Sequence, residues 1–282
     1  MSEKMCGLCP RRCRVDRAAG EVGFCGVGSE VVVARTMLHM WEEPPISGTH
    51  GSGAVFFSGC SLRCVFCQNK PISHSTKGET VDEKGLVSIM LDLQSRGAHN
   101  INLVTPTHFA DKIASALEKA KPMLKIPVVY NCGGYESVDT LRRFDGLVDI
   151  YLPDYKYASG ELASEYSAAP DYPEVASAAL REMVRLVGAP IFGSDGMLKR
   201  GVIVRHLVLP STRRDSMKVL DRIADAAGVS NVRLSLMSQY TPDFAEDCNI
   251  ACLHRKVTSF EYDSVLDYAE KLGFDVNFDA AN

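Results

Sequence analysis

Residues 54–69 read AVFFSGCSLRCVFCQN, an apolar strand-like run followed at once by a short loop with three cysteines. Cys60, Cys64 and Cys67 follow the spacing Cys-x3-Cys-x2-Cys. A cubane iron-sulfur cluster has four irons and is usually held by four thiolates, so three cysteines leave one iron open to a substrate or cofactor. Closely spaced cysteines also suit zinc, but a structural zinc site needs four closed ligands, and no fourth ligand lies in this loop. The spacing therefore favours an iron-sulfur cluster.

Beyond this loop, apolar runs alternate with segments of helical period. Six runs read as strands, at residues 54–57, 101–104, 128–131, 148–152, 202–209 and 232–236. In front of the helical pattern that begins near residue 86, Thr80 and Glu83 have the spacing of a capping box. Strands that alternate with helices predict a parallel sheet with right-handed crossovers, either an open doubly wound sheet or a barrel. Periodicity alone does not decide between the two.

Composition sets the class of protein. The chain has 282 residues, of which 46% are hydrophobic, and this is enough for one large α/β core. A net charge of -4 gives no basic field, so a nucleic-acid partner is not expected. No apolar run is long enough to span a bilayer, and no membrane partner is expected. Because the ten cysteines occur in a long chain that opens without a signal peptide, we expect metal ligation in a soluble, cytoplasmic protein rather than a disulfide framework.

A second group of cysteines lies near the N-terminus, with the spacing Cys-x2-Cys-x3-Cys-x11-Cys. Its members are Cys6, Cys9, Cys13 and Cys25. Four closely spaced cysteines predict a metal site, which is either a closed zinc site or an auxiliary iron-sulfur cluster. The same segment contains the one dense basic cluster of the chain, Arg11, Arg12, Arg14 and Arg17. These arginines are either a solvated surface or a docking surface for an acidic electron donor such as flavodoxin.

The three-cysteine loop, with the aromatic Phe66 just before its third cysteine, resembles the signature of the radical S-adenosylmethionine (SAM) superfamily. The resemblance implies that Cys60, Cys64 and Cys67 hold a 4Fe-4S cluster and that SAM binds its open iron. One electron then cleaves SAM to a 5′-deoxyadenosyl radical. It also implies a partial (βα)6 barrel with its active site at the carboxyl ends of the strands, as in barrels generally. We expect residues 54–282 to form this barrel and residues 1–53 to form a cysteine-rich N-terminal arm.

Within that superfamily, the chain resembles the activating enzymes of glycyl radical enzymes, such as the pyruvate formate-lyase activating enzyme. Asp154 and Lys156 match an Asp-x-Lys element whose lysine meets the SAM carboxylate, Arg205 matches an arginine that reaches the cofactor, and Asn131 with Gly133 matches an Asn-Gly segment. These residues, with Phe66, are therefore implied to bind the cofactor. Taken one at a time, these residues also fit ordinary structural roles. Lys156 is then a surface lysine, Arg205 part of a strand-edge ion pair, and Gly133 part of a plain turn. The implied substrate is a backbone glycine on a partner protein.

Two features depart from that family. Where the activating enzymes carry Gly-Gly-Glu for the SAM amino group, residues 104–108 read VTPTH, which leaves Thr105, Thr107 or backbone carbonyls for this contact. The long arm before the cysteine loop also contains Glu42 and Glu43, which either line the active site or are exposed.

Other functions remain open at the level of sequence. A radical SAM enzyme that acts on a small molecule or peptide is one alternative, and in that case Cys132 would be a catalytic thiol rather than a buried packing residue. A non-enzymatic protein with two closed structural metal sites is the alternative from another class. Iron and sulfide content separates the last possibility from the others.

Overall fold

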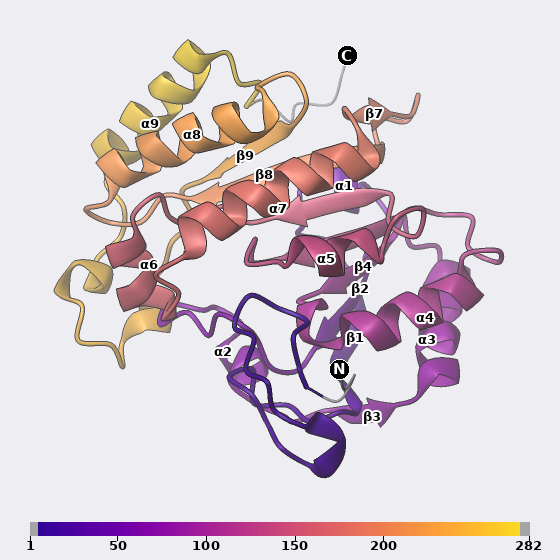
Figure 1. Cartoon of the computed structure of the whole chain (residues 1–282). Coiled ribbons are helices and arrows are strands. Elements are labelled where there is room, and N and C mark those ends of the chain that lie inside the picture. Colours follow the sequence, from indigo (N-terminus) through magenta and orange to yellow (C-terminus); the bar gives the residue numbers. More distant parts are fainter. Residues whose placement is uncertain (1–4, 277–282) are drawn as a thin grey trace.

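A mixed β-sheet forms the centre of the computed structural model, which describes residues 5–276 (Figure 1). Neighbouring strands follow the order β3-β1-β2-β4-β5-β6-β8-β7, and β9 pairs with β8. The parallel strands are β2 (Ser52–Phe57), β4 (Ile101–Val104), β5 (Val128–Cys132), β6 (Ile150–Pro153), β8 (Leu198–Leu207) and β9 (Arg233–Met237). All six coincide with runs that the sequence predicts. The expected α/β class with a parallel-stranded, barrel-like sheet is confirmed.

Three antiparallel strands extend this sheet: β1 (Val31–His39), β3 (Glu79–Val81) and β7 (Ile191–Phe192). β1 was not expected, and it lies within the predicted N-terminal arm. It pairs with β2 from Val33↔Phe57 to His39↔Ser52, so the chain from residue 40 to 51 returns at the amino end of β2. The arm thus contributes a strand to the same sheet, while the predicted boundary at residues 53 and 54 stays a prediction.

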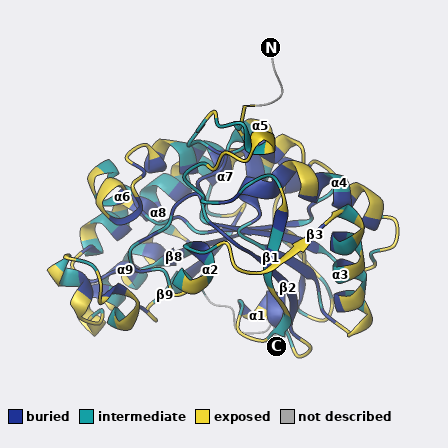
Figure 2. Ribbon diagram, turned by 90° about the horizontal axis from the view of Figure 1, so that it is seen from below, coloured by how far each residue is buried: buried dark blue, intermediate teal, exposed yellow. Residues whose placement is uncertain are grey.

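Helices surround the strands, and their outer faces are exposed (Figure 2). The α-helices are α1 (Pro44–Ser47), α2 (Lys70–Ser73), α3 (Glu83–Ser95), α4 (Ala110–Ala120), α5 (Val138–Arg142), α6 (Gly160–Ser167), α7 (Tyr172–Val187), α8 (Arg213–Ala227) and α9 (Ser259–Leu272). Short 3-10 helices are η1 (Arg17–Ala19), η2 (Thr107–Phe109), η3 (Pro242–Ala245) and η4 (Ala251–His254). Among residues 5–276, no helix has the length and apolar character needed to cross a membrane.

The predicted N-cap of α3 was wrong. Thr80 lies in β3, and the N-cap is Asp82, whose Oδ1 accepts a hydrogen bond of 2.8 Å from the Gly85 backbone N–H. A carboxylate at the N-cap satisfies an otherwise unpaired N–H of the first turn, as a hydroxyl would. The sequence pattern therefore found the helix but placed its cap two residues too early.

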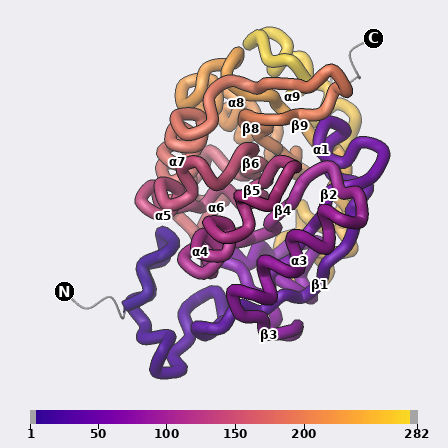
Figure 3. Tube along the Cα trace, turned by 90° about the vertical axis from the view of Figure 1, so that its right-hand side faces the viewer, coloured from indigo at the N-terminus to yellow at the C-terminus, as the bar shows by residue number. Residues whose placement is uncertain are grey.

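The sheet has two different faces. Its outer face packs under the helices in a large apolar core, to which Tyr130 and Cys132 of β5 belong. A smaller apolar cluster on the inner face contains Val129, Ile150, Leu152, Leu198 and Ile203 together with Ile46 of α1. Since α1 follows the turn after β1, it closes the inner face at the amino ends of the strands. Figure 3 shows α1 and the cysteine-bearing start of the arm on opposite sides of the molecule.

Candidate active site

Because side chains alternate between the two faces along a strand, a set of polar residues on the parallel strands points to the inner face of the sheet. Asn131 lies two residues after Val129 on β5, and Arg205 lies two residues after Ile203 on β8, so both point to the same side as these inner apolar residues. Asp154 directly follows β6 and forms a parallel bridge with Arg205. The predicted residues Asn131, Asp154 and Arg205 are thus brought together at the carboxyl ends of three strands.

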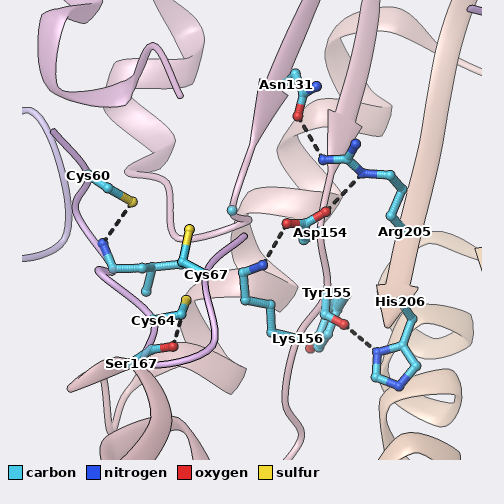
Figure 4. Close-up of polar contacts among 12 residues, drawn as sticks. Cys60, Cys64, Cys67, Asn131, Asp154, Tyr155, Lys156, Ser167, Arg205 and His206 are labelled. Atoms are coloured by element: carbon cyan, nitrogen blue, oxygen red, sulfur yellow. Dashed lines mark hydrogen bonds and ion pairs between the residues drawn. The ribbon is translucent and has the colours of Figure 1, made fainter. Parts of the chain in front are cut away.

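Arg205 is the centre of this set. Its Nε donates to Asp154 Oδ1 at 2.8 Å and its Nη2 to Asn131 Oδ1 at 2.7 Å (Figure 4), while Nη1 donates to Glu42 Oε2 at 3.1 Å. The other oxygen of Glu42, Oε1, accepts from Asn102 Nδ2 at 3.2 Å and from Asn131 Nδ2 at 3.1 Å. Three of the five N–H groups of the guanidinium are therefore used, which fixes its plane and leaves two N–H groups for a ligand.

The arm supplies acidic residues to the barrel interior. Glu42 joins the Arg205 network, and Glu43 is 8% exposed, whereas the neighbouring Trp41 is 86% exposed. Of the two alternatives for this glutamate pair, the structure supports the buried one. Asn102 on β4 was missed by the sequence analysis, although an amide inside the apolar strand Ile101–Val104 is a signal that a polar partner lies nearby.

Lys156 links this network to the cysteine loop. Its Nζ lies 2.6 Å from Asp154 Oδ2, and Figure 4 shows the ammonium on the side of Asp154 that faces the cysteines. Burial alone would lower the pKa of Lys156, but Asp154 and the nearby thiols Cys64 and Cys67 raise it above its usual value. For Asp154, burial would raise the pKa, yet Arg205 and Lys156 outweigh it and lower the pKa. Both groups of the pair are therefore charged at neutral pH.

Each thiol of the cysteine loop has a polar neighbour. The Leu62 backbone N–H donates to Cys60 Sγ at 3.3 Å, Ser167 Oγ donates to Cys64 Sγ at 2.9 Å, and Ser73 Oγ donates to Cys67 Sγ at 3.3 Å. Burial, with Cys64 and Cys67 nearby, raises the pKa of Cys60 to about 12. A buried thiol whose pKa is raised in this way needs a nearby cation to become a thiolate, and iron would supply that charge.

The donor set fits an iron-sulfur cluster. Three cysteines on one loop, with hydroxyl and backbone donors aimed at their sulfurs, match the thiolate ligation and hydrogen bonding that such clusters have. Within residues 5–276, no group of three His, Cys, Asp or Glu side chains is placed to hold a metal ion as it stands. Ligation by Cys60, Cys64 and Cys67 therefore stays a prediction, and it requires the three thiols to draw together.

The N-terminal cysteines also lie near one another. Burial raises the pKa of Cys9 to about 12, and the nearby Cys25 and Cys13 add to this rise. For Cys25, burial likewise raises the pKa, with Cys6 and Cys13 adding to it. Gly23 packs so closely on this group that a Cβ there would lie 3.0 Å from Cys13 Sγ. A four-thiol metal site here remains a prediction with a suitable donor set.

Two of the four clustered arginines fasten the arm to the barrel, Arg11 at the cysteine loop and Arg17 at η2. Arg11 donates from Nε to the Ser61 carbonyl and from Nη2 to the Ser167 carbonyl, both at 2.8 Å, and its guanidinium lies 3.9 Å from the Phe24 ring centroid. Arg17 donates to the carbonyl of His108 at 2.6 Å. Arg12 and Arg14 are the exposed members of the cluster. Any docking surface made by the cluster therefore relies mainly on these two.

The remaining predicted cofactor residues lie beside the loop. Phe66 is buried and packs edge-on against Tyr166 and Tyr240, with ring centroids 6.2 Å apart in each case. Gly133 follows β5, where a Cβ would lie 2.7 Å from Leu62 Cδ1 in the cysteine loop. Both residues therefore shape the loop, and their contact with a cofactor stays a prediction.

Two other predicted candidates have different surroundings. Cys132 belongs to the outer core rather than the inner face, and burial raises the pKa of its thiol well above the usual value. Thr107 donates to Glu136 Oε1 at 2.7 Å, so its hydroxyl is held in place and keeps its oxygen lone pairs for an ammonium donor. Of the hydroxyls considered for the SAM amino group, only that of Thr105, at the end of β4, has no such contact among those found in residues 5–276.

Gly134→Ala is expected to destabilise the protein at the site. Gly134 has a φ of +78°, and a Cβ there would clash with the carbonyl oxygen of Asp154 and lie 2.8 Å from Tyr172 Oη. Gly146→Ala is the matched control, since its φ is +72° but no atom lies within 4 Å. We expect Gly134→Ala to lose roughly 1–3 kcal/mol more of the free energy of unfolding in urea than the control. Equal losses would show that the close approach to Asp154 is absent.

Comparison with known proteins supports the fold. No model of a known protein family matches the chain. The chain is 29% identical over 290 residues to Uncharacterized protein MJ0674 of Methanocaldococcus jannaschii, and the match covers 98% of this chain and 77% of that protein. The crystal structure of methylornithine synthase (PylB) aligns with a TM-score of 0.50 and 14% identity, and that of Streptococcus suis SuiB with a TM-score of 0.48 and 14% identity. These alignments cover 75% and 78% of this chain.

The chain spans 59% of the length of the methylornithine synthase chain and 46% of that of SuiB. The likeness to methylornithine synthase therefore concerns the aligned part of each chain. It shows that the two proteins share a parallel-stranded α/β fold.

Proposed function

We propose that this protein is a radical SAM enzyme. The observation that carries the proposal is the position of the three-cysteine loop directly after β2, with its thiols on the side of Asp154 where the half-buried ammonium of Lys156 lies (Figure 4). The resemblance of this loop to the superfamily signature supports it, as does the fold shared with methylornithine synthase. The carboxyl ends of parallel strands are also where barrels of this kind bind their ligands.

The residues of the chain have distinct tasks in this proposal. A 4Fe-4S cluster with SAM on its open iron supplies one-electron cleavage of the sulfonium to a 5′-deoxyadenosyl radical. Cys60, Cys64 and Cys67 provide the thiolates. Lys156 binds the SAM carboxylate through a charge-assisted hydrogen bond, and the two N–H groups of Arg205 that remain available bind a second acceptor. Asp154 holds both cations in place through contacts of 2.6 and 2.8 Å.

The finer assignment is activation of a glycyl radical enzyme, with hydrogen abstracted from a glycine of that partner. The resemblance of Asp154, Lys156 and Arg205 to the activating enzymes supports it. An electron donor such as flavodoxin would reduce the cluster, and the exposed Arg12 and Arg14 offer it positive charge. The N-terminal cysteines would form a closed zinc or iron-sulfur site that holds Arg11 against the cysteine loop.

A second candidate is a radical SAM enzyme with a small-molecule substrate. The observation that favours it is the inner face itself, where a polar layer around Arg205 lies above an apolar floor that Ile46 of α1 helps to close. Because the apolar floor lies at the amino ends of the strands, a molecule bound to this layer would lie on the side of the cysteine loop. This arrangement suits a compact substrate.

Lys156→Ala is expected to weaken SAM binding while the iron content stays unchanged. Loss of a charge-assisted hydrogen bond costs about 1.5–3 kcal/mol, which corresponds to a rise in Kd of roughly 10- to 100-fold. Asp154 keeps its contact with Arg205 in this variant, so the network is retained. Isothermal titration of SAM into the reconstituted protein measures the change, with the exposed Lys84→Ala as control. An unaltered Kd would remove Lys156 from the SAM site.

Metal analysis separates the enzyme from a structural metal protein. After anaerobic reconstitution with iron and sulfide, we expect about four irons and four sulfides at the three-cysteine loop, with the absorbance of a 4Fe-4S cluster. If the N-terminal site also binds iron, a variant that lacks Cys9 and Cys13 isolates the first contribution. Zinc at both sites without sulfide would contradict the proposed function.

A further inference from the structure

Two buried oxygen atoms on the inner face lack partners. Within residues 5–276, Glu43 Oε2 and Asn102 Oδ1 have no hydrogen-bond partner. Glu43 is 8% exposed and Asn102 is fully buried. Buried polar atoms in folded proteins nearly always have a partner, because leaving an acceptor unpaired costs about 1–3 kcal/mol. Two such acceptors on one face therefore indicate a group that completes them.

Both acceptors adjoin the Arg205 network. Ser235 lies close enough to the carboxyl group of Glu43 to lower its pKa, and Ser235 is the register partner of Arg205 across β8 and β9. Asn102 contacts Glu42 through its amide nitrogen, which leaves its oxygen free. The two acceptors thus belong to the polar layer that lies between the apolar floor and the Lys156 ammonium.

The charge of this layer is unbalanced. Among residues 5–276, it contains the carboxyl groups of Glu42, Glu43 and Asp154, but only the cations Lys156 and Arg205. Arg205 and Lys156 are already paired with Asp154, and Arg205 also with Glu42, so Glu43 is the group left without a paired cation in the described part of the chain. Burial raises the pKa of Glu43, although Arg205 opposes this rise. A cationic donor beside Glu43 would relieve the cost of burying this carboxyl group.

We propose that the barrel interior binds a small molecule with a primary ammonium group, held by Glu43, and with a second N–H or O–H donor directed to Asn102. This inference rests on the proposed function and names the substrate class for its small-molecule form. A primary ammonium is compact and has three N–H donors and no acceptor, which matches acceptors that lie deep inside the barrel. A glycine on a folded partner protein has no such group to offer at this depth.

Methylammonium chloride is the probe that tests the site, because it carries this headgroup and little else. Thermal unfolding of the full, reconstituted chain is followed at increasing methylammonium, with potassium chloride at equal concentration as the reference. A ligand that binds only the folded protein raises the unfolding temperature as its concentration passes Kd. We expect a saturable rise of a few degrees in wild type and in Glu118→Gln, an exposed control on α4. In Glu43→Gln, an isosteric variant without the negative charge, we expect the rise to be lost.

Several outcomes would overturn the proposal. They are an equal rise in Glu43→Gln, no rise above potassium chloride in wild type, or the same rise with tetramethylammonium, which has the charge but no N–H donor. The wild-type comparison of the three salts stands even if Glu43→Gln does not fold. Since this readout needs no SAM cleavage, a failed site leaves the radical SAM assignment untouched, and absent SAM cleavage in wild type refutes that assignment whatever methylammonium does.

Discussion

Cys64→Ala is expected to abolish binding of the 4Fe-4S cluster at the three-cysteine loop, and with it all SAM cleavage. Cys64 is the most buried of the three cysteines, and its sulfur accepts a 2.9 Å hydrogen bond from Ser167 Oγ. With two thiolates left, the loop no longer supplies the ligands that a cluster with one open iron requires. Iron and sulfide per chain after reconstitution, together with the visible absorbance, measure the loss.

Cys248→Ala is the matched control, since Cys248 is half-buried and lies outside both cysteine groups. It should load as wild type does. If the Cys64→Ala chain retains a full complement of iron and sulfide at the first site, the cluster lies elsewhere and the three-cysteine loop has another role. Removal of Cys9 and Cys13 in the same background keeps iron at the N-terminal site from obscuring the result.

Arg205→Ala is expected to lower the free energy of unfolding by about 3–5 kcal/mol, because it leaves buried charged partners without their cation. Glu42 would lose its 3.1 Å contact and Asp154 its 2.8 Å contact, and Asn131 Oδ1 would lose its donor. The side chain of Arg205 is 15% exposed, so water does not easily replace it. Urea denaturation measures the change.

The control for this variant is Arg181→Ala, which removes an exposed arginine from α7 and should alter stability by less than about 0.5 kcal/mol. Arg205→Lys tests geometry separately from charge. A lysine keeps the cation but lacks the fork that reaches three acceptors at once, so we expect an intermediate loss. A loss in Arg205→Ala no larger than in Arg181→Ala would mean that the network does not exist in solution.

The sequence predicts the parallel core well because its strands are buried on both faces and read as continuous apolar runs. β1 escaped detection, since its later residues, from Arg35 to His39, are half-buried or exposed and break the apolar pattern. The cap of α3 was placed at Thr80 rather than Asp82 because both residue types suit an N-cap and spacing alone does not separate them. In both cases the pairing of β1 with β3 determines the local structure, and the sequence pattern alone does not show this pairing.

The candidate site likewise contains residues that the sequence predicts as neighbours and residues that it does not. Asn131, Asp154 and Arg205 were predictable as neighbours because parallel strands bring their carboxyl ends to one edge. Glu42 lies 163 positions from Arg205 in the chain, and their contact depends on the antiparallel course of β1, which no local pattern reveals. The same holds for Arg11, whose contacts with the cysteine loop and the end of α6 come from the path of the arm.

The most direct test of radical SAM chemistry is chromatography for 5′-deoxyadenosine after the reconstituted protein is reduced with dithionite in the presence of SAM. We predict that wild type forms 5′-deoxyadenosine and that Cys64→Ala forms none. A wild-type protein that carries its full iron and sulfide, binds SAM and still yields no 5′-deoxyadenosine above the Cys64→Ala background would contradict the proposed function.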